Sequence, residues 1–175
     1  LRKNILIKES RERTIHKTLK GSKQAAIAIG QLCPRRNHPD FPGIKFLNTI
    51  FGGFFGSRLM KNLREDKGFT YGVFSSARSL PLNGQWGIYT EVGIDIYEAA
   101  LNEISHEIER LNNDKVSKEE LEIVKNYISG SFLSTLDGPF ALADRFKSIY
   151  FSGLGYDYFD YFLETKKFYL LPVKH

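Results

Sequence analysis

The sequence predicts an α+β fold, in which a largely antiparallel or mixed sheet is covered on one face by helices. Three observations support this. An apolar run near the N-terminus and two β-rich segments on either side of residue 82 are typical of strands. Most of the remaining chain places apolar residues at helical spacing. The order of strand, helices, hairpin and helices does not alternate as in a doubly wound nucleotide-binding fold.

Residues 1–22 are polar and basic, and we expect them to form an edge strand or a linker segment. Short strands are expected at "NILI" and "TIHKTL" within them. Residues 23–32, "KQAAIAIGQL", then predict a buried strand because the run is short and nearly continuously apolar. A loop with three prolines follows and leads into a helix over residues 44–51.

Ser57 is the expected N-cap of a short helix over residues 58–66, which Gly68 ends. The segment 69–80 predicts a strand, 81–84 a turn, and 85–94 the antiparallel partner strand. Beyond this hairpin the pattern predicts only helices. They are expected at 96–112, from a capping box at Ser117 to about Leu133, at 139–151 behind Pro139, and at 156–169.

A length of 175 residues fits one domain, 1–175, with a sizeable core. We expect this domain to be a fragment of a longer protein, because it starts without Met. No apolar run is long enough to span a bilayer. The single cysteine, Cys33, excludes an internal disulfide but does not identify the compartment, which stays unknown. The basic N-terminal residues could contact nucleic acid, but a solvated edge accounts for them better, so no nucleic-acid partner is predicted.

Three familiar site types do not fit. A phosphate loop needs G-x-x-x-x-G-K-[ST], whereas "GGFFGSR" has a different spacing and lacks the Lys. Glu103 and His106 have the spacing of a helical metal-ligand pair, but they lie on the polar flank of their predicted helix. We therefore predict no metal bound by this chain. No serine nucleophile motif is present, and Ser117 beside Lys118 is explained by helix capping.

Arg64 and Tyr71 are the candidate catalytic residues. Arg64 lies in the last turn of its predicted helix, Tyr71 lies in the next strand, and Gly68 reverses the chain between them. A guanidinium and a phenol directed at one point form an oxyanion clamp, because both donate hydrogen bonds to a developing negative oxygen. Spacing alone leaves a second interpretation open, in which Arg64 caps its own helix and Tyr71 packs in the sheet.

The stretch "HPDFPGIKFLNTIFGGFFGSRLMKNLREDKGFTYGVFSS" resembles the second, non-catalytic domain of pitrilysin/insulinase-type zinc metallopeptidases, a family that includes the mitochondrial processing peptidase. The resemblance covers nearly the whole chain. It implies one half of a clamshell, whose partner is a homologous zinc-binding domain on the same polypeptide or on another subunit. Zinc is then expected on that partner, and no cofactor on this chain.

By the same resemblance, Arg64 and Tyr71, seven residues apart, reach the scissile carbonyl of a peptide substrate. The glycine loop (Gly52, Gly53, Gly56) is carried over as a substrate-contacting or lid element, while the Phe54–Phe55 pair has no counterpart that we can interpret. The implied function is the substrate-binding half of a zinc metallopeptidase, inactive alone because it lacks His-x-x-Glu-His. The alternative is a non-proteolytic core subunit of the same family.

Overall fold

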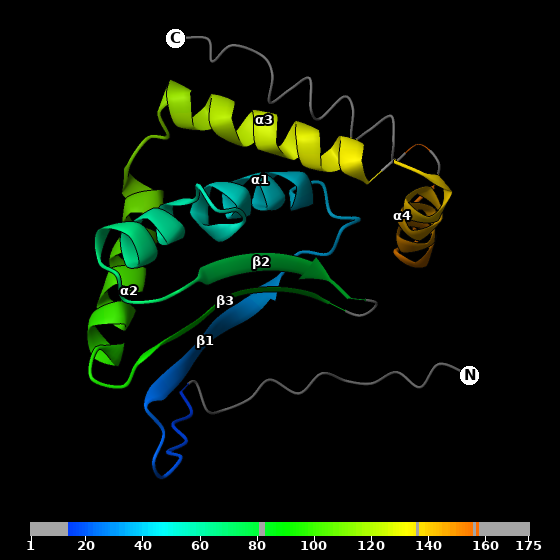
Figure 1. The fold of residues 1–175 in the computed structure, drawn as a ribbon. Coiled ribbons are helices and arrows are strands. Elements are labelled where there is room, and N and C mark those ends of the chain that lie inside the picture. The colour runs from blue at the N-terminus through cyan, green and yellow to red at the C-terminus, as the bar shows by residue number, and fades with distance from the viewer. Residues whose placement is uncertain (1–13, 81–82, 136, 156, 158–175) are drawn as a thin grey trace.

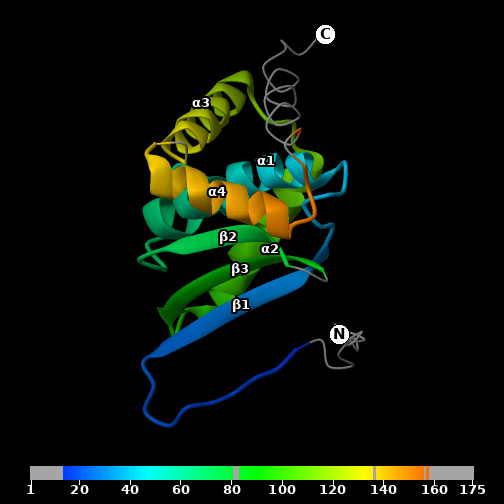
Figure 2. The ribbon, with the colours of Figure 1, turned by 90° about the vertical axis from the view of Figure 1, so that its right-hand side faces the viewer.

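The computed structural model describes residues 14–80, 83–135, 137–155 and 157. Three strands, β1 (Gln24–Cys33), β2 (Val73–Ser79) and β3 (Gly84–Gly93), form the sheet. The helices are α1 (Phe41–Gly52), the π-helix η1 (Met60–Asp66), α2 (Tyr97–Asn113), α3 (Lys118–Ser134) and α4 (Pro139–Phe151). Figures 1 and 2 show the helices stacked to one side of the sheet. This arrangement confirms the predicted α+β fold.

The sheet has the strand order β1-β3-β2, and both strand pairs are antiparallel. The β2–β3 hairpin is therefore as predicted, although β2 begins at Val73 and not at Phe69. The residues before Val73 do not pair with β3 because the Thr70 side chain holds them in a turn. Its hydroxyl accepts a hydrogen bond from the Gly72 backbone N–H at 3.1 Å.

The main core lies between the sheet and the helices. Alternate residues of β2 and β3 face this core, as expected for a sheet with one buried face. The prediction of a buried strand at residues 23–32 is wrong, because β1 comes first in the strand order and only Ile27 of it is buried. The predicted apolar stripe of α2 packs here too. The buried members of this cluster are Ile27, Val73, Ile88 and Val92 from the strands, and Phe51, Leu59, Met60, Leu63, Ala100 and Ile104 from the helical segments.

A second apolar cluster joins α3 to α1, so that α3 forms a further layer above α1 (Figure 1). Phe46 and Ile50 of α1 bury Val124 of α3. The Ser117 half of the capping box predicted at the start of α3 is present, because the Ser117 hydroxyl accepts a hydrogen bond from the Glu120 backbone N–H at 3.1 Å. The Glu120 carboxylate, which would complete the box, accepts hydrogen bonds from Arg58 instead.

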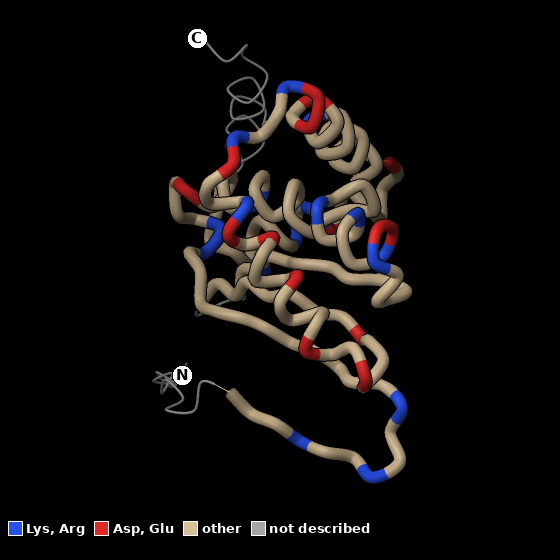
Figure 3. The backbone as a smooth tube through the Cα atoms, turned by 90° about the vertical axis from the view of Figure 1, so that its left-hand side faces the viewer, with Lys and Arg blue, Asp and Glu red and all other residues tan. Residues whose placement is uncertain are grey.

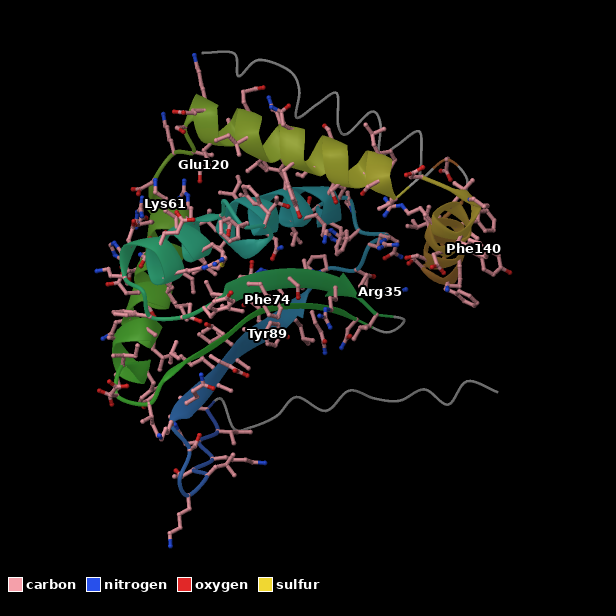
Figure 4. The ribbon with its side chains drawn as sticks, in the orientation of Figure 1. Arg35, Lys61, Phe74, Tyr89, Glu120 and Phe140 are labelled. Atoms are coloured by element: carbon pink, nitrogen blue, oxygen red, sulfur yellow. The ribbon has the colours of Figure 1, made fainter. Side chains whose placement is uncertain are left out.

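The other face of the sheet carries an aromatic pair. Phe74 of β2 and Tyr89 of β3 are register partners whose rings stack with centroids 5.3 Å apart. Figure 4 shows both side chains on the strands, and no described helix covers them.

Several local predictions need correction. Residues 14–19 form no strand, and α1 begins at Phe41 and not at Ile44 because Pro42 suits the first helical turn. Residues 1–13, residues 81–82 of the predicted turn, and all but Asp157 of the predicted helix at 156–169 lie outside the described residues.

The charged residues are distributed unevenly. Figure 3 shows acidic and basic residues mixed along the helices, while the charged residues of the described N-terminal segment are basic.

Polar contacts fix the short helical segment around η1 to two neighbouring helices. Arg58 donates two hydrogen bonds to Glu120 of α3, each 2.8 Å long. The Asn62 amide donates to Glu103 and Glu107 of α2 at 3.0 and 2.7 Å. Glu103 was expected on a solvated helix face, but it holds this interhelical contact because α2 packs beside η1.

Glu103 provides a test of this contact by pH. The hydrogen bond from Asn62, followed by the contact with Lys67 at 3.1 Å, lowers the pKa of Glu103. A carboxyl group whose pKa is lower in the folded state stabilises the fold at pH values above its unfolded-state pKa. This stabilisation is lost as the pH falls through the folded-state pKa. In urea titrations, the loss of unfolding free energy caused by Glu103→Gln should therefore shrink as the solution is acidified. The exposed neighbour Glu109→Gln is the control, and a loss that grows with acid would contradict this.

A second test concerns the close approach of α1 to β2. A Cβ added at Gly52 would lie 2.6 Å from Ser75 Oγ and 2.9 Å from Leu59 Cδ1. Gly52→Ala should therefore lower the unfolding free energy by about 1–3 kcal/mol through overpacking. At Gly130 of α3 nothing lies within 4 Å of an added Cβ, so Gly130→Ala should raise it by about 0.5–1 kcal/mol. Equal effects in chemical denaturation would contradict this account.

Candidate functional site

A π-helical turn determines where Arg64 lies. The Lys67 backbone N–H donates to the Asn62 carbonyl at 3.0 Å, an i to i+5 hydrogen bond. Leu59 and Leu63 are fully buried in the core, and they fix this segment against the sheet. Arg64 follows Leu63 directly and is only partly buried. The sequence predicted an ordinary α-helix here, and the wider turn was missed because a single π-helical turn leaves no periodic pattern of apolar residues.

Ser57 does not cap this segment through its side chain, contrary to the prediction. Its hydroxyl is buried and has no partner among the described residues. The Ser57 backbone carbonyl instead accepts a hydrogen bond from the Lys61 backbone N–H at 3.0 Å. The start of the helix is therefore held by its backbone and by the contact between Arg58 and Glu120.

The chain reverses after η1 and places Tyr71 on the surface. Gly68 has a φ of +65°, which favours glycine and allows the reversal. The Thr70 hydroxyl then donates to the Glu91 carbonyl of β3 at 2.7 Å and anchors the turn. Tyr71 comes next, and its side chain is 90% exposed. The interpretation in which Tyr71 packs in the sheet is therefore wrong.

Arg64 and Tyr71 meet at this corner. The Arg64 guanidinium carbon lies over the Tyr71 ring at 5.2 Å from its centroid, and over the Phe55 ring at 4.6 Å. Both distances are within the range of cation–π contacts. Among the residues that the structure describes, Arg64 forms no hydrogen bond or ion pair, and it does not cap its own helix. Arg64 is partly exposed and Tyr71 almost fully exposed, so both side chains are accessible on the surface where they meet.

The glycine loop borders the same corner, but its three glycines have different environments. Gly52 is buried beneath Ser75, and Gly53 is half-buried against the last turn of α1. Gly56 is exposed, and a Cβ added there would lie 2.8 Å from Cε2 of Phe54. Close packing therefore accounts for Gly52 and Gly53, while Gly56 belongs to the exposed tip of the loop.

Phe55 is the member of this corner that sequence reasoning missed. Its ring is 60% exposed and contacts Arg64, which is nine residues further along the chain. The double phenylalanine was visible in the sequence, but no periodicity assigns one ring to the core and the other to the surface. That assignment depends on how the loop leaves α1.

A polar cavity of about 690 Å³ lies on another side of the same helical segment, between α2 and α3. Its lining includes Arg58, Lys61, Asn62, Glu107 and Glu120, and excludes Arg64 and Tyr71. Figure 4 shows Lys61 and Glu120 in this region of the molecule. The hydrogen bond to Glu120 is the main reason that the pKa of Arg58 is raised. Phe54 and Gly56 of the glycine loop also line this cavity, so the cavity borders the loop but contains neither Arg64 nor Tyr71 in its lining.

Within the described ranges, no group of three or more His, Cys, Asp or Glu residues is placed to hold a metal ion. Glu103 and His106, which have the spacing of a ligand pair but were not predicted to bind a metal, belong to no such group, and Glu103 contacts Asn62 and Lys67. None of the described helices is both long and apolar enough to cross a membrane. The Arg64 guanidinium and the Tyr71 hydroxyl are groups that can donate hydrogen bonds to a carbonyl oxygen or an anion.

Comparison with known proteins identifies relatives of this chain. The sequence model of the peptidase M16 inactive domain matches residues 4–128. The uncharacterized zinc protease YmxG of Bacillus subtilis is 30% identical over 118 residues, which cover 67% of this chain and 29% of YmxG. YmfF of the same bacterium, a probable inactive metalloprotease, is 25% identical over 105 residues, or 60% of this chain and 24% of YmfF.

A solved structure agrees with these matches. The peptidase M16 inactive domain from Pseudomonas fluorescens has a TM-score of 0.75 and 25% identity, over 83% of this chain and 35% of that chain. The chain thus spans about a third or less of each of these proteins. The match over most of its length confirms the resemblance noted in the sequence, and the chain belongs to the peptidase M16 inactive domain family.

Proposed function

We propose that this chain is the substrate-binding, transition-state-stabilising half of a zinc metalloendopeptidase that acts on peptides or unfolded segments. Membership of the peptidase M16 inactive domain family supports this proposal, as does the description of YmxG as a zinc protease. The zinc site lies on a homologous domain, either on the same polypeptide or on a partner subunit.

The observation that carries the proposal is the pairing of Arg64 with Tyr71. Arg64 has no carboxylate partner among the described residues, and Tyr71 is almost fully exposed. Arg64 is only partly buried, so water can satisfy its donors in the free protein, and a ligand can replace that water. Here the donors of both side chains are available to a ligand.

The chemistry assigned to this chain is oxyanion stabilisation. A zinc ion held by the other domain would supply an activated water for attack on the peptide carbonyl. Negative charge then develops on the carbonyl oxygen, and Arg64 and Tyr71 donate hydrogen bonds to it. Donors fixed in advance at the site of developing charge stabilise the transition state more than the ground state.

We assign the loop to the approach path of the peptide. Gly56 at the exposed tip contacts the substrate, with Gly53 behind it. Gly52 contributes by letting α1 approach β2 closely, so that the loop leaves α1 at the required point. The alternative function, a non-proteolytic core subunit, is favoured by the likeness to YmfF, which is described as probably inactive.

The first functional test measures turnover in the full protein, with its zinc-binding domain present. Arg64→Ala and Tyr71→Phe should each lower kcat by about 10²–10³, because each removes one oxyanion donor. Zinc content, measured by metal analysis, should not change.

The controls for this test match the residue types. Arg78→Ala removes an exposed arginine of β2, and Tyr150→Phe removes the hydroxyl of an exposed tyrosine of α4. Both should leave kcat unchanged. If Arg64→Ala and Tyr71→Phe also leave it unchanged, the clamp does not exist. If the wild-type protein hydrolyses no peptide although zinc is bound, the structural alternative is favoured.

A second functional test uses the chain alone. Because the sequence contains no His-x-x-Glu-His pattern, we expect the isolated chain neither to bind zinc at a one-to-one ratio nor to hydrolyse a fluorogenic peptide. Addition of the zinc-binding domain should restore hydrolysis. Stoichiometric zinc binding or hydrolysis by the chain alone would overturn the account.

A further inference from the structure

Two neighbouring phenylalanines in the glycine loop have opposite environments. Phe54 stacks on Tyr127 of α3 with ring centroids 4.7 Å apart, and it packs against the cluster between α1 and α3. Phe55 turns outward, and its ring is 60% exposed. Phe54 thus anchors the loop, while Phe55 adds almost nothing to the apolar core.

The contact that Phe55 does make is with the guanidinium of Arg64, at 4.6 Å from the ring centroid. This is shorter than the corresponding distance of 5.2 Å to Tyr71. Phe55 lies between Phe54, which stacks on Tyr127, and Gly56, where an added Cβ would lie 2.8 Å from Cε2 of Phe54. The loop therefore places an aromatic face where the arginine side chain ends.

Such a contact matters because of the way arginine binds anions. A guanidinium that lies over a ring face keeps its N–H groups, which lie in its own plane, available for hydrogen bonds. A long side chain on an open surface otherwise samples many rotamers and must be ordered when it binds. Two ring contacts reduce that freedom before substrate arrives, and preorganised donors are the ones that accelerate a reaction.

We propose that Phe55 is a positioning residue, which holds the Arg64 guanidinium in the orientation that stabilises the oxyanion. This inference rests on the proposed function of Arg64. Phe55 acts through Arg64 and forms no hydrogen bond with the substrate. The two phenylalanines then have different roles: Phe54 holds the loop against α3, and Phe55 holds the guanidinium of Arg64.

The test compares Phe55→Leu with Phe55→Tyr in the full, zinc-containing protein. Leucine keeps an apolar side chain but removes the aromatic face, so kcat should fall by roughly two- to fivefold, the range that corresponds to an exposed cation–π contact. KM should change little. Tyrosine keeps the ring, so Phe55→Tyr should retain the wild-type kcat. Phe140→Leu, the same change at an exposed phenylalanine of α4, should have no effect.

A double-mutant cycle separates positioning from a merely structural role. In an Arg64→Ala background, Phe55→Leu should cause no further loss of kcat, because there is no guanidinium left to hold. An equal fold loss in both backgrounds, or a wild-type kcat for Phe55→Leu alone, would overturn the inference. If Arg64→Ala itself leaves kcat unchanged, the proposed function fails first, so the two failures are distinguishable.

Discussion

The candidate site depends on the way the segment from Arg58 to Asp66 is held against the rest of the molecule. Leu59 and Leu63 of this segment are fully buried in the core. On its polar sides, Arg58 is bound to α3 and Asn62 to α2. Three sets of contacts thus fix one short helix, and its π-helical turn directs Arg64 away from the core. A π-helical turn at this place agrees with the frequent occurrence of such turns at functional sites.

The same constraint explains why the site is an open corner and not a cavity. Arg64, Tyr71 and Phe55 come from the end of a helix, from the turn before β2 and from the loop after α1. They meet on the surface because each preceding segment is anchored: the helix by its leucines, the turn by Thr70, and the loop by Phe54 stacked on Tyr127. Such a surface offers donors but no enclosure. It therefore suits one half of a cleft, in which a second domain would complete the walls and exclude water.

Much of the fold could be predicted from the sequence because its signals were local. The hairpin, the apolar stripe of α2 and the cap at Ser117 each follow from a pattern within a few residues. The predictions failed where contacts between distant parts of the chain determine the local conformation. The late start of β2 depends on the Thr70 hydrogen bond to β3, and the π-helical turn depends on packing against three neighbours. Arg64 and Tyr71 are candidates that follow from spacing and resemblance, whereas the contact of Phe55 with Arg64 was not predicted, since only the folded loop shows which phenylalanine faces the arginine.

The proposed function requires that Arg64 binds the transition state of peptide hydrolysis more tightly than it binds the substrate. The most direct measurement is the dissociation constant of a phosphinic peptide, a tetrahedral transition-state analogue, for the full zinc-containing protein and its Arg64→Ala variant. The account predicts that the variant binds this analogue more weakly by about the factor that it loses in kcat/KM, since an analogue reports transition-state affinity. The same analogue affinity in both proteins would contradict the claim.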